Sequence, residues 1–362
     1  MNQMENLTSP LRFKVRFARR WRPLILVHIH SMAMLTFLFG MPDSPASAQG
    51  NWDIGLSAGI SNYIGDIGDG TGPGRAFIWD LQELKSRPAL GVFVRHKLDQ
   101  SGLWHIRSDF NKIHIAGSDK NTQYAPRRGR NLHFRNRMIE VSLRMERDLF
   151  QAPLTWARQR RARVTVRGFL GVARLHHNPQ AQLDPGNRLY SQFSSQFGFD
   201  PDRWYDLAPF QTEGVAYETS ITTIPFGLMA LIAGQKRGGV TDFYLSLEMG
   251  VRWTNSDYLD DISSFYADPS QMEGVGAALS SQSNQAVLDD AGPDAGSLSA
   301  HSFIQEAPVS RGNQTNDDWY GTIMVSFGKV VNQRNHYFSR NRSRYGNKRR
   351  IKRSPNRRRM RY

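Results

Sequence analysis

The chain has 362 residues and a formal charge of +15, with 47 lysines and arginines against 32 aspartates and glutamates. It contains no cysteine, which excludes disulfide bonds and thiolate chemistry but leaves the compartment open. This length allows one or two domains.

The first 48 residues have the features of a secretory signal peptide. Six arginines and lysines between positions 12 and 22 precede a largely apolar run over residues 24–41, and Ala46-Ser47-Ala48 fits an A-x-A cleavage site. The alternative is an uncleaved membrane anchor, but two histidines interrupt the apolar run and a polar stretch follows it. We therefore predict a signal peptide over residues 1–48. No later run reaches the ~18 apolar residues of a transmembrane helix.

Eight segments of the remaining chain alternate apolar and polar residues with a period of two, which indicates β-strands with one apolar face. The predicted strands cover, in chain order, residues 52–61, 87–98, 103–115, 139–146, 163–175, 217–232, 241–253 and 319–327. The seventh has apolar residues at every second position from Phe243 to Trp253, which is long for a soluble strand and suits a bilayer-spanning one. In the sixth, Pro225 lacks a ladder donor, so we expect a bulge or irregularity there.

The connections between these strands alternate between long and short. The long ones are residues 62–86, 116–129, 176–216 and 255–317. Outer-membrane barrels have long extracellular loops and short periplasmic turns, whereas a soluble β-sandwich, the alternative, gives no reason for this asymmetry. We therefore predict an all-β fold, an eight-stranded antiparallel up-and-down transmembrane β-barrel over residues 49–329, in the cell outer membrane with both chain ends in the periplasm.

The polar face of the predicted strands carries charges of both signs. The residues expected to point inward are Asp53, Arg95, Arg107, Asp109, Glu140, Arg144, Glu146, Arg167, Glu248 and Arg252. Side chains fill the interior of an eight-stranded barrel, and buried charges must be paired because an unpaired ion costs several kcal/mol. We expect a salt-bridged plug in which Glu140, Arg144, Glu248 and Arg252 form one network. A narrow charged channel is the alternative.

No catalytic constellation is evident, and we predict a protein that is not an enzyme and needs no cofactor or metal. His176 and His177 are adjacent, so on a strand they would point to opposite faces. The carboxylates of Asp257, Asp260 and Asp261 are of the type that binds Ca²⁺, but their spacing is not that of an EF-hand. We expect them to cap turns and accept hydrogen bonds within the loop.

The last segment, residues 330–362, is strongly basic and carries nearly all of the net positive charge. Runs of like charge are typically disordered interaction tails. Its candidate partner-binding residues are Arg340, Arg342, Arg344, Lys348, Arg349, Arg350, Lys352 and Arg353. For a periplasmic tail we expect an acidic protein surface, anionic lipid head groups or the cell wall as partner, and no nucleic acid.

Several short motifs in the predicted loops resemble a known family. They are Asn62-Tyr63-Ile64-Gly65-Asp66, Arg87-Pro88-Ala89-Leu90-Gly91, His177-Asn178-Pro179, Thr212-Glu213-Gly214, Asp257-Tyr258-Leu259-Asp260-Asp261-Ile262-Ser263 and Asp317-Asp318-Trp319-Tyr320. Together they resemble PorG, the outer-membrane β-barrel component of the type IX secretion system of Bacteroidota. The resemblance extends to about residue 329 and excludes the basic tail. The family-motif residues of the loops are Gly65, Asp66, Asp257, Tyr258, Asp260, Asp261 and Trp319. The most specific of these motifs is Tyr258-Leu259-Asp260-Asp261, which follows a strand that ends in tryptophan.

The resemblance implies a non-enzymatic barrel that associates with the periplasmic ring of the PorK lipoprotein and PorN. We therefore expect this chain to anchor or position that ring at the outer membrane, with outer-membrane lipids as its other partner. The alternatives from other classes are a small-barrel lipid hydrolase of the outer membrane, and a surface barrel or adhesin that acts through its extracellular loops.

Overall fold

The computed structural model describes residues 52–68, 86–99, 101–154, 161–187, 200–235, 241–268, 272, 274–296, 309–315 and 317–331. These residues all belong to one compact unit, Gln49–Tyr362. The predicted signal peptide and all eight of the candidate tail residues lie outside the described residues.

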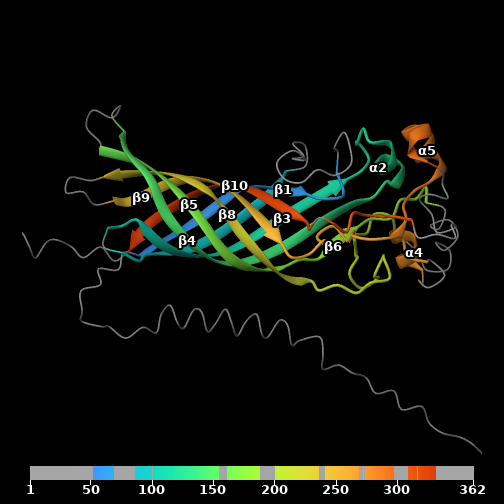
Figure 1. Ribbon diagram of the computed structural model, residues 1–362, viewed down its shortest axis with the longest axis horizontal. Coiled ribbons are helices and arrows are strands. Elements are labelled where there is room, and N and C mark those ends of the chain that lie inside the picture. Colours follow the sequence, from blue (N-terminus) through green and yellow to red (C-terminus); the bar gives the residue numbers. More distant parts are fainter. Residues whose placement is uncertain are drawn as a thin grey trace, which may run out of the picture. The chain divides into compact units, whose positions relative to one another are not determined.

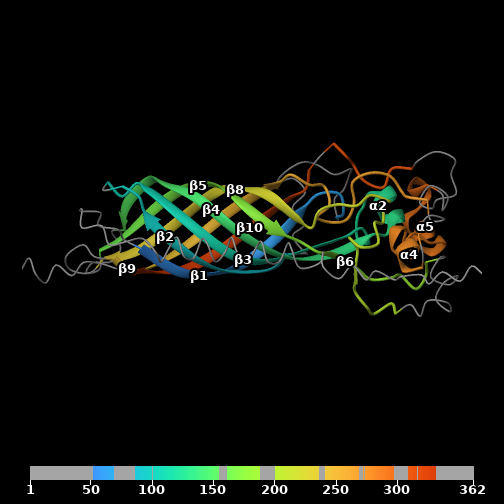
Figure 2. The ribbon, with the colours of Figure 1, turned by 90° about the horizontal axis from the view of Figure 1, so that it is seen from below.

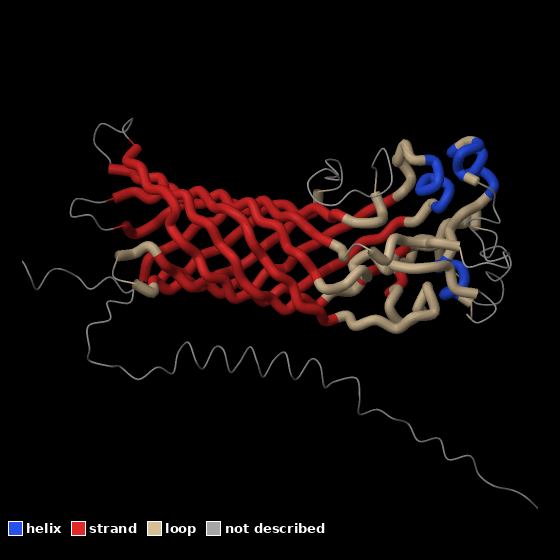
Figure 3. The backbone as a smooth tube through the Cα atoms, in the orientation of Figure 1, coloured by secondary structure: helices blue, strands red, loops and turns tan. Residues whose placement is uncertain are grey.

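Eight antiparallel strands close into a barrel (Figures 1 and 3). Each strand pairs with its neighbour in the chain, β1 pairs with β10, and the pairing of β3 with β4 completes the circuit through β5, β8 and β9. The barrel strands are β1 Trp52–Ile64, β2 Arg87–Lys97, β3 Trp104–Ser118, β4 His133–Leu154, β5 Arg161–His176, β8 Ser220–Gln235, β9 Thr241–Thr254 and β10 Trp319–Val331. The predicted eight-stranded up-and-down barrel is therefore confirmed.

The exterior of the barrel is a continuous apolar belt, because the apolar residues of every strand share the outward parity. Leu56 is 64% exposed, Leu170 60% and Met249 59%, which is far more than a soluble core strand would show. Aromatic side chains lie at both edges of this belt. Phe243 stacks on Phe327 with ring centroids 5.4 Å apart near the short turns, and Trp253 pairs with Trp319 near the long loops.

The height of the belt follows from the strand geometry. Phe243 and Trp253 are both on β9, and the strand rises about 33 Å between them at ~3.3 Å per residue. With strands tilted by roughly 35–45°, this corresponds to about 25 Å along the barrel axis, which is the height of the apolar band of outer-membrane barrels.

The described parts of the long connections lie at one end of the barrel, and the strand ends that the short connections join lie at the other (Figures 1 and 2). The loop end carries the helices α2 Ala125–Arg130, α4 Val275–Ser280 and α5 Gln285–Ala291, the 3-10 helix η4 Pro293–Ala295, and the short strands β6 Pro179–Ala181 and β7 Tyr205–Asp206. Ala181, Leu183, Tyr205, Leu207, Ala278 and Leu279 form a separate apolar cluster there. Within the described ranges, no helix is long and apolar enough to cross a membrane.

Two details differ from the sequence prediction. Strand β4 is far longer than expected: toward the loops burial alternates from Phe134 onward although Arg135, Asn136 and Arg137 are all polar, and at the other end the strand continues to Leu154. Strands β1 and β3 continue through residues 62–64 and 116–118, which the prediction placed in loops. The irregularity expected at Pro225 is confirmed, because the pairing of β8 with β5 is interrupted at Ile224 and Pro225 and then resumes in the same register, without a bulge.

Candidate functional site: the barrel interior and the loop-side carboxylates

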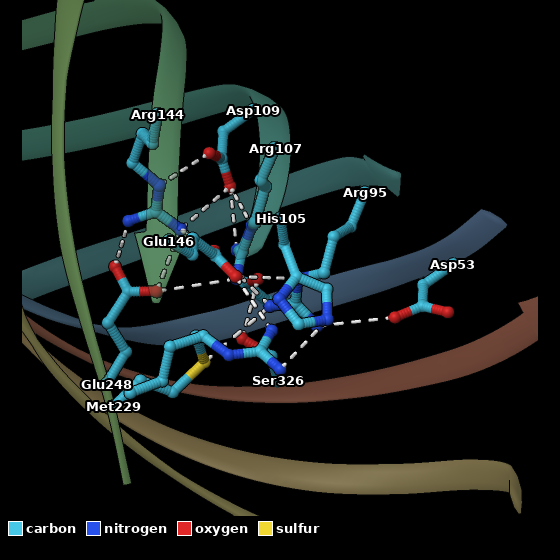
Figure 4. Close-up of polar contacts among 12 residues, drawn as sticks. Asp53, Arg95, His105, Arg107, Asp109, Arg144, Glu146, Met229, Glu248 and Ser326 are labelled. Carbon is cyan, nitrogen blue, oxygen red and sulfur yellow. Dashed lines mark hydrogen bonds and ion pairs between the residues drawn. The ribbon is translucent and has the colours of Figure 1, made fainter. Parts of the chain in front are cut away.

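The middle of the barrel is filled by a network of ion pairs from β1, β2, β3, β4, β5 and β9 (Figure 4). All ten residues predicted to point inward are buried or nearly so, and Asp148 joins them. The described network therefore contains five arginines and six carboxylates, so the two signs are almost balanced.

Arg144 lies at the centre of this network. Its guanidinium forms a two-point contact with Glu248, with N–O distances of 2.6 and 2.9 Å, and its Nε lies 3.0 Å from Asp109. Arg107 lies 2.6 Å from Asp109 and 3.5 Å from Glu248, so the same two carboxylates hold two guanidinium groups. Charge-assisted contacts of this kind are short and directional, and they fix the side chains in one arrangement.

Glu146 holds the arginines nearest the short turns. Its carboxylate lies 2.8 Å from Nε of Arg95 and 2.9 Å from Arg167. Arg95 also donates to the Tyr244 hydroxyl at 2.6 Å, and Arg167 pairs with Asp148 at 2.5 Å.

The four residues predicted to form one network are brought together by the structure. Arg144 bonds Glu248 directly, whereas Arg252 lies 3.4 Å from Glu140 and 3.9 Å from Glu248. Glu140 also accepts hydrogen bonds from Asn111 at 2.9 Å and from the Tyr320 hydroxyl at 2.6 Å. These two neutral donors were not predicted from the sequence.

Aromatic rings that lie over glycines occupy the remaining interior space. The ring of Phe169 lies against Gly227 and Gly250, where a Cβ would come within 2.8 and 2.9 Å of Cζ. The guanidinium of Arg144 also lies over the ring of Phe169, 4.3 Å from its centroid. The glycines on the polar faces of β8 and β9 therefore make room for a side chain from another strand.

An apolar plug lies between the ion pairs and the loops. It contains the inward residues of the loop-end strand segments, among them Phe134, Met138 and Tyr320, together with Leu259 and Ile262 from the β9–β10 loop. Leu259 is fully buried and Ile262 is 1% exposed. The β9–β10 loop therefore folds back into the barrel mouth and closes it with apolar side chains.

The motif residues that carry the family resemblance meet above this plug. The Tyr63 hydroxyl lies 2.7 Å from carboxylate oxygens of both Asp260 and Asp318, and the Asp66 amide donates to the same hydroxyl at 3.0 Å. A Cβ at Gly65 would overlap the Tyr63 hydroxyl, so only glycine fits there. Asp318 also accepts a hydrogen bond from the Leu259 amide at 2.9 Å, which holds the inserted loop.

Asp261 faces a different set of partners. Its backbone has φ 71°, a left-handed conformation in which aspartate is tolerated better than most residues. Its carboxylate accepts hydrogen bonds from Thr212 and from Tyr217, and Arg311 donates to its carbonyl oxygen at 2.6 Å. Arg311 also pairs with Glu213 at 3.1 Å, so the third and fourth long loops are joined here.

Burial raises the pKa of most carboxylates in this region. Desolvation, followed by the neighbouring charge of Asp260, raises the pKa of Asp257 to about 9. Desolvation and the charge of Asp66 raise the pKa of Asp260 to about 8. Desolvation also raises the pKa of Asp261 to about 6, although Arg311 opposes the shift. Asp257 and Asp260 therefore hold protons at neutral pH, and the Tyr63 hydroxyl joins Asp260 and Asp318.

The structure places the other motif residues around this group. Tyr258 stacks on Tyr217 with centroids 4.6 Å apart, and Trp319 is the first residue of β10. Asp257, Asp260 and Asp261 do not converge, because Asp260 faces Tyr63 whereas Asp261 faces Thr212 and Tyr217. In the described part of the chain, no group of three or more histidines and carboxylates is arranged to hold a metal ion.

The two histidines considered as candidates have separate environments. His176 is the exposed last residue of β5, opposite Ser220, whose hydroxyl accepts a hydrogen bond from Arg174 at 2.9 Å. His177 is fully buried, 3.1 Å from the carbonyl oxygen of Glu218, and its ring lies parallel to Tyr217. Burial lowers the pKa of His177 to about 4.

The comparisons with known proteins give one match to a family model. A family described as a domain of unknown function (DUF6089) matches residues 31–180. No curated protein matches the chain.

Three solved structures of small barrels are similar to the chain at low scores. The attachment invasion locus protein Ail of Yersinia pestis is 7% identical, with coverage of 78% of this chain and 97% of that one and a TM-score of 0.28. Neisserial surface protein A is 6% identical, with coverage of 78% and 98% and a TM-score of 0.26. A major outer membrane protein of Thermus thermophilus is 11% identical, with coverage of 78% and 99% and a TM-score of 0.28.

Proposed function

We propose that this chain is a non-enzymatic outer-membrane barrel that anchors or positions a periplasmic protein assembly, the PorK/PorN ring of a type IX secretion system. The observation that supports an anchoring role, rather than transport through the barrel, is the filled interior. Ion pairs occupy the middle of the barrel and an apolar plug closes its loop end, so the described interior offers no route for a solute. A closed barrel of this kind acts through its ends.

The outer-membrane location rests on the exterior of the barrel. Large apolar side chains such as Leu56 and Met249 are more than half exposed, and in water such a surface would be an aggregation site. A belt about 25 Å high with aromatic edges is what a bilayer requires of a barrel. Because β1 begins and β10 ends at the end of the barrel where the short connections join the strands, we assign that end to the periplasm.

The secretion-system part rests on the resemblance to PorG. The structure supports it indirectly, because motif residues that are scattered in the sequence form one contact group: Gly65 lies against Tyr63, and Tyr63 bonds Asp260 and Asp318. We infer that the motif residues are shared with that family because their contacts hold the loops closed over the barrel. Contacts with the ring would then lie at the opposite, periplasmic end, where the basic tail begins.

The test is affinity purification of the full-length protein from native outer membranes, followed by identification of the proteins that copurify. We expect PorK-like and PorN-like ring proteins, in amounts that fall when residues 334–362 are deleted. A tail of the same length in which all thirteen lysines and arginines of residues 334–362 are replaced by glutamine separates charge from length. The charge-neutral tail should behave like the deletion, because exposed charges act within about 8 Å at physiological salt.

Two results would contradict this proposal. If the full-length barrel inserts but no ring protein copurifies, it does not anchor the ring. If deletion of the tail changes neither copurification nor secretion of cargo, the tail has no part in attachment, and the periplasmic turns alone would have to provide the contact.

A further inference from the structure

The outer surface of the barrel changes from apolar to basic on one side of its loop end. On three adjacent strands the outward apolar residues end at Phe110 of β3, Ile139 of β4 and Val172 of β5. On each strand the next two outward positions toward the loops hold a basic residue. We call these six the rim residues: Lys112, His114, Arg135, Arg137, Arg174 and His176.

The ladder register makes the rim residues one patch. Arg137 is directly opposite His114, and Ile139 is flanked by Lys112 on one side and His176 on the other. Diagonal neighbours on one face of a sheet are about 7–8 Å apart, so the six side chains are contiguous. Burial, together with the charges of Lys112, Arg137, Arg135 and Arg87, lowers the pKa of His114, so the charge of the patch comes mainly from its lysine and arginines. Arg87 adds a further exposed cation at the start of β2.

No ion pair neutralises these side chains within the part of the chain that the structure describes. Arg174 donates to the hydroxyls of Ser220 and Thr222, and Arg135 donates to the Gln180 amide oxygen and stacks on Trp204. These are neutral partners that orient the guanidinium groups and leave their charge in place.

Two carboxylates lie on neighbouring loops. That of Asp206 accepts hydrogen bonds from the amides of Asn178 and Gln180, at 2.9 and 2.6 Å, and so has neutral partners of its own. Glu218 is exposed in the loop before β8, two residues from Ser220. The patch therefore has a surplus of positive charge.

We propose that the rim residues bind phosphate groups of lipopolysaccharide in the outer leaflet of the outer membrane. The patch begins where the apolar belt ends, which is the depth of the lipid head groups. Guanidinium groups pair with phosphate in two-point geometry, and several cations close together suit a lipid with more than one phosphate. The inference rests on the proposed location, with the long loops outside the cell.

The one-sidedness of the patch supports binding of a discrete lipid. Toward the loops, β8 ends in Thr222 and Ser220, whereas β9 and β10 meet at Trp253 and Trp319. A general attraction to the membrane surface would need cations all around the barrel, as in a polybasic belt. Within the described strands, cations gathered on the adjacent strands β2 to β5 instead define a site beside one part of the barrel wall.

The experiment titrates purified, full-length protein in detergent with lipid A that carries two phosphates, and with dephosphorylated lipid A, and counts bound lipids by native mass spectrometry. The test variant combines Lys112→Gln, Arg137→Gln and Arg174→Gln. The matched control removes three exposed cations from the short-turn end: Arg147→Gln, Arg163→Gln and Lys329→Gln. A cation at a lipid surface contributes about fivefold in affinity, so the test variant should bind phosphorylated lipid A roughly 100-fold more weakly.

The control variant should bind within about twofold of the unmodified protein, and dephosphorylated lipid A should bind weakly to all three proteins. Heat-modifiable migration on gels checks that each variant is folded. Equal affinity of the test variant and the unmodified protein, or equal binding of the two forms of lipid A, would overturn the proposal. The titration decides this whether or not ring proteins copurify, so the two proposals fail separately.

Discussion

Replacement of Arg144 by methionine should destabilise the barrel more than any change on its outer face. Methionine keeps much of the length of the side chain but removes a guanidinium that has three carboxylates within 4 Å, those of Asp109, Glu146 and Glu248. Glu248 loses both of its short contacts and retains Arg107 at 3.5 Å and Arg252 at 3.9 Å. Because the described network already has one carboxylate more than it has arginines, the loss of a cation increases the imbalance.

The expected cost is about 3–5 kcal/mol, the range for a buried ion pair that loses one partner. Glu248→Ala removes a carboxylate instead and restores the numerical balance, so its cost should lie at the lower end of that range. The double variant should cost less than the sum of the two by about 1–3 kcal/mol, because the second change removes a charge that the first left unpaired. Arg147→Met is the control, since Arg147 is exposed on the same strand and its contact with Trp104 contributes about 1 kcal/mol or less.

The measurement is urea unfolding of the refolded protein in lipid vesicles, followed by tryptophan fluorescence, with gel migration of unheated samples as a second probe. A cost below about 1 kcal/mol for Arg144→Met would refute the reasoning. So would single and double variants that add within about 0.5 kcal/mol, because they would show that Arg144 and Glu248 do not interact.

Three further outcomes are expected. In planar bilayers the purified barrel should show no porin-sized current, because ion pairs and the apolar plug fill its interior; a stable large conductance would contradict this. Raising the pH from 6 to 9 should loosen the β9–β10 loop, measured by hydrogen exchange over residues 255–264. The pKa of Asp260 is raised to about 8 on folding, so the stability that its proton provides is lost as the pH rises towards that value. Asp260→Asn should reduce the effect, and Asp257, whose pKa is raised to about 9, accounts for the remainder. A protease site inserted at Gly292 should be cut on intact cells, whereas cleavage only after permeabilisation would invert the topology.

The strands and the identity of the interior charges could be predicted because both follow from side-chain parity. In a strand, alternate residues face opposite sides, so Glu248 and Arg252 fall on the same face as Tyr244 without any knowledge of the partners. The barrel register then decides which charges meet, and the sequence holds no direct record of it. The contact between Arg144 and Glu248 joins strands that are not neighbours in the barrel, and only the closed structure shows it.

The loop-end contacts could be predicted less well. The motif residues were recognised as a set, but nothing in their spacing indicated that the Tyr63 hydroxyl would lie between Asp260 and Asp318. These two residues are 197 and 255 positions away from Tyr63 in the sequence. The pairs Arg130–Asp119 and Arg311–Glu213 were missed, because isolated charges in long polar loops carry no periodic signal. Loop residues are placed by contacts that are distant in sequence, and composition does not encode those contacts.

Strand β4 shows how one parity rule gives arginine two different roles. Arg144 points inward, where water is excluded, and it is tolerated because carboxylates from β3, β4 and β9 surround it. Arg137 is an odd number of positions away, so it points outward, and no carboxylate is placed beside it in the described structure. An interior arginine without partners would be costly, whereas an exterior one at the head-group level keeps its charge available for a phosphate. Arginine therefore belongs to the ion-pair network on the inner face of the strand and to the proposed lipid site on the outer face. A shift of one residue in register would exchange the two faces and destroy both arrangements.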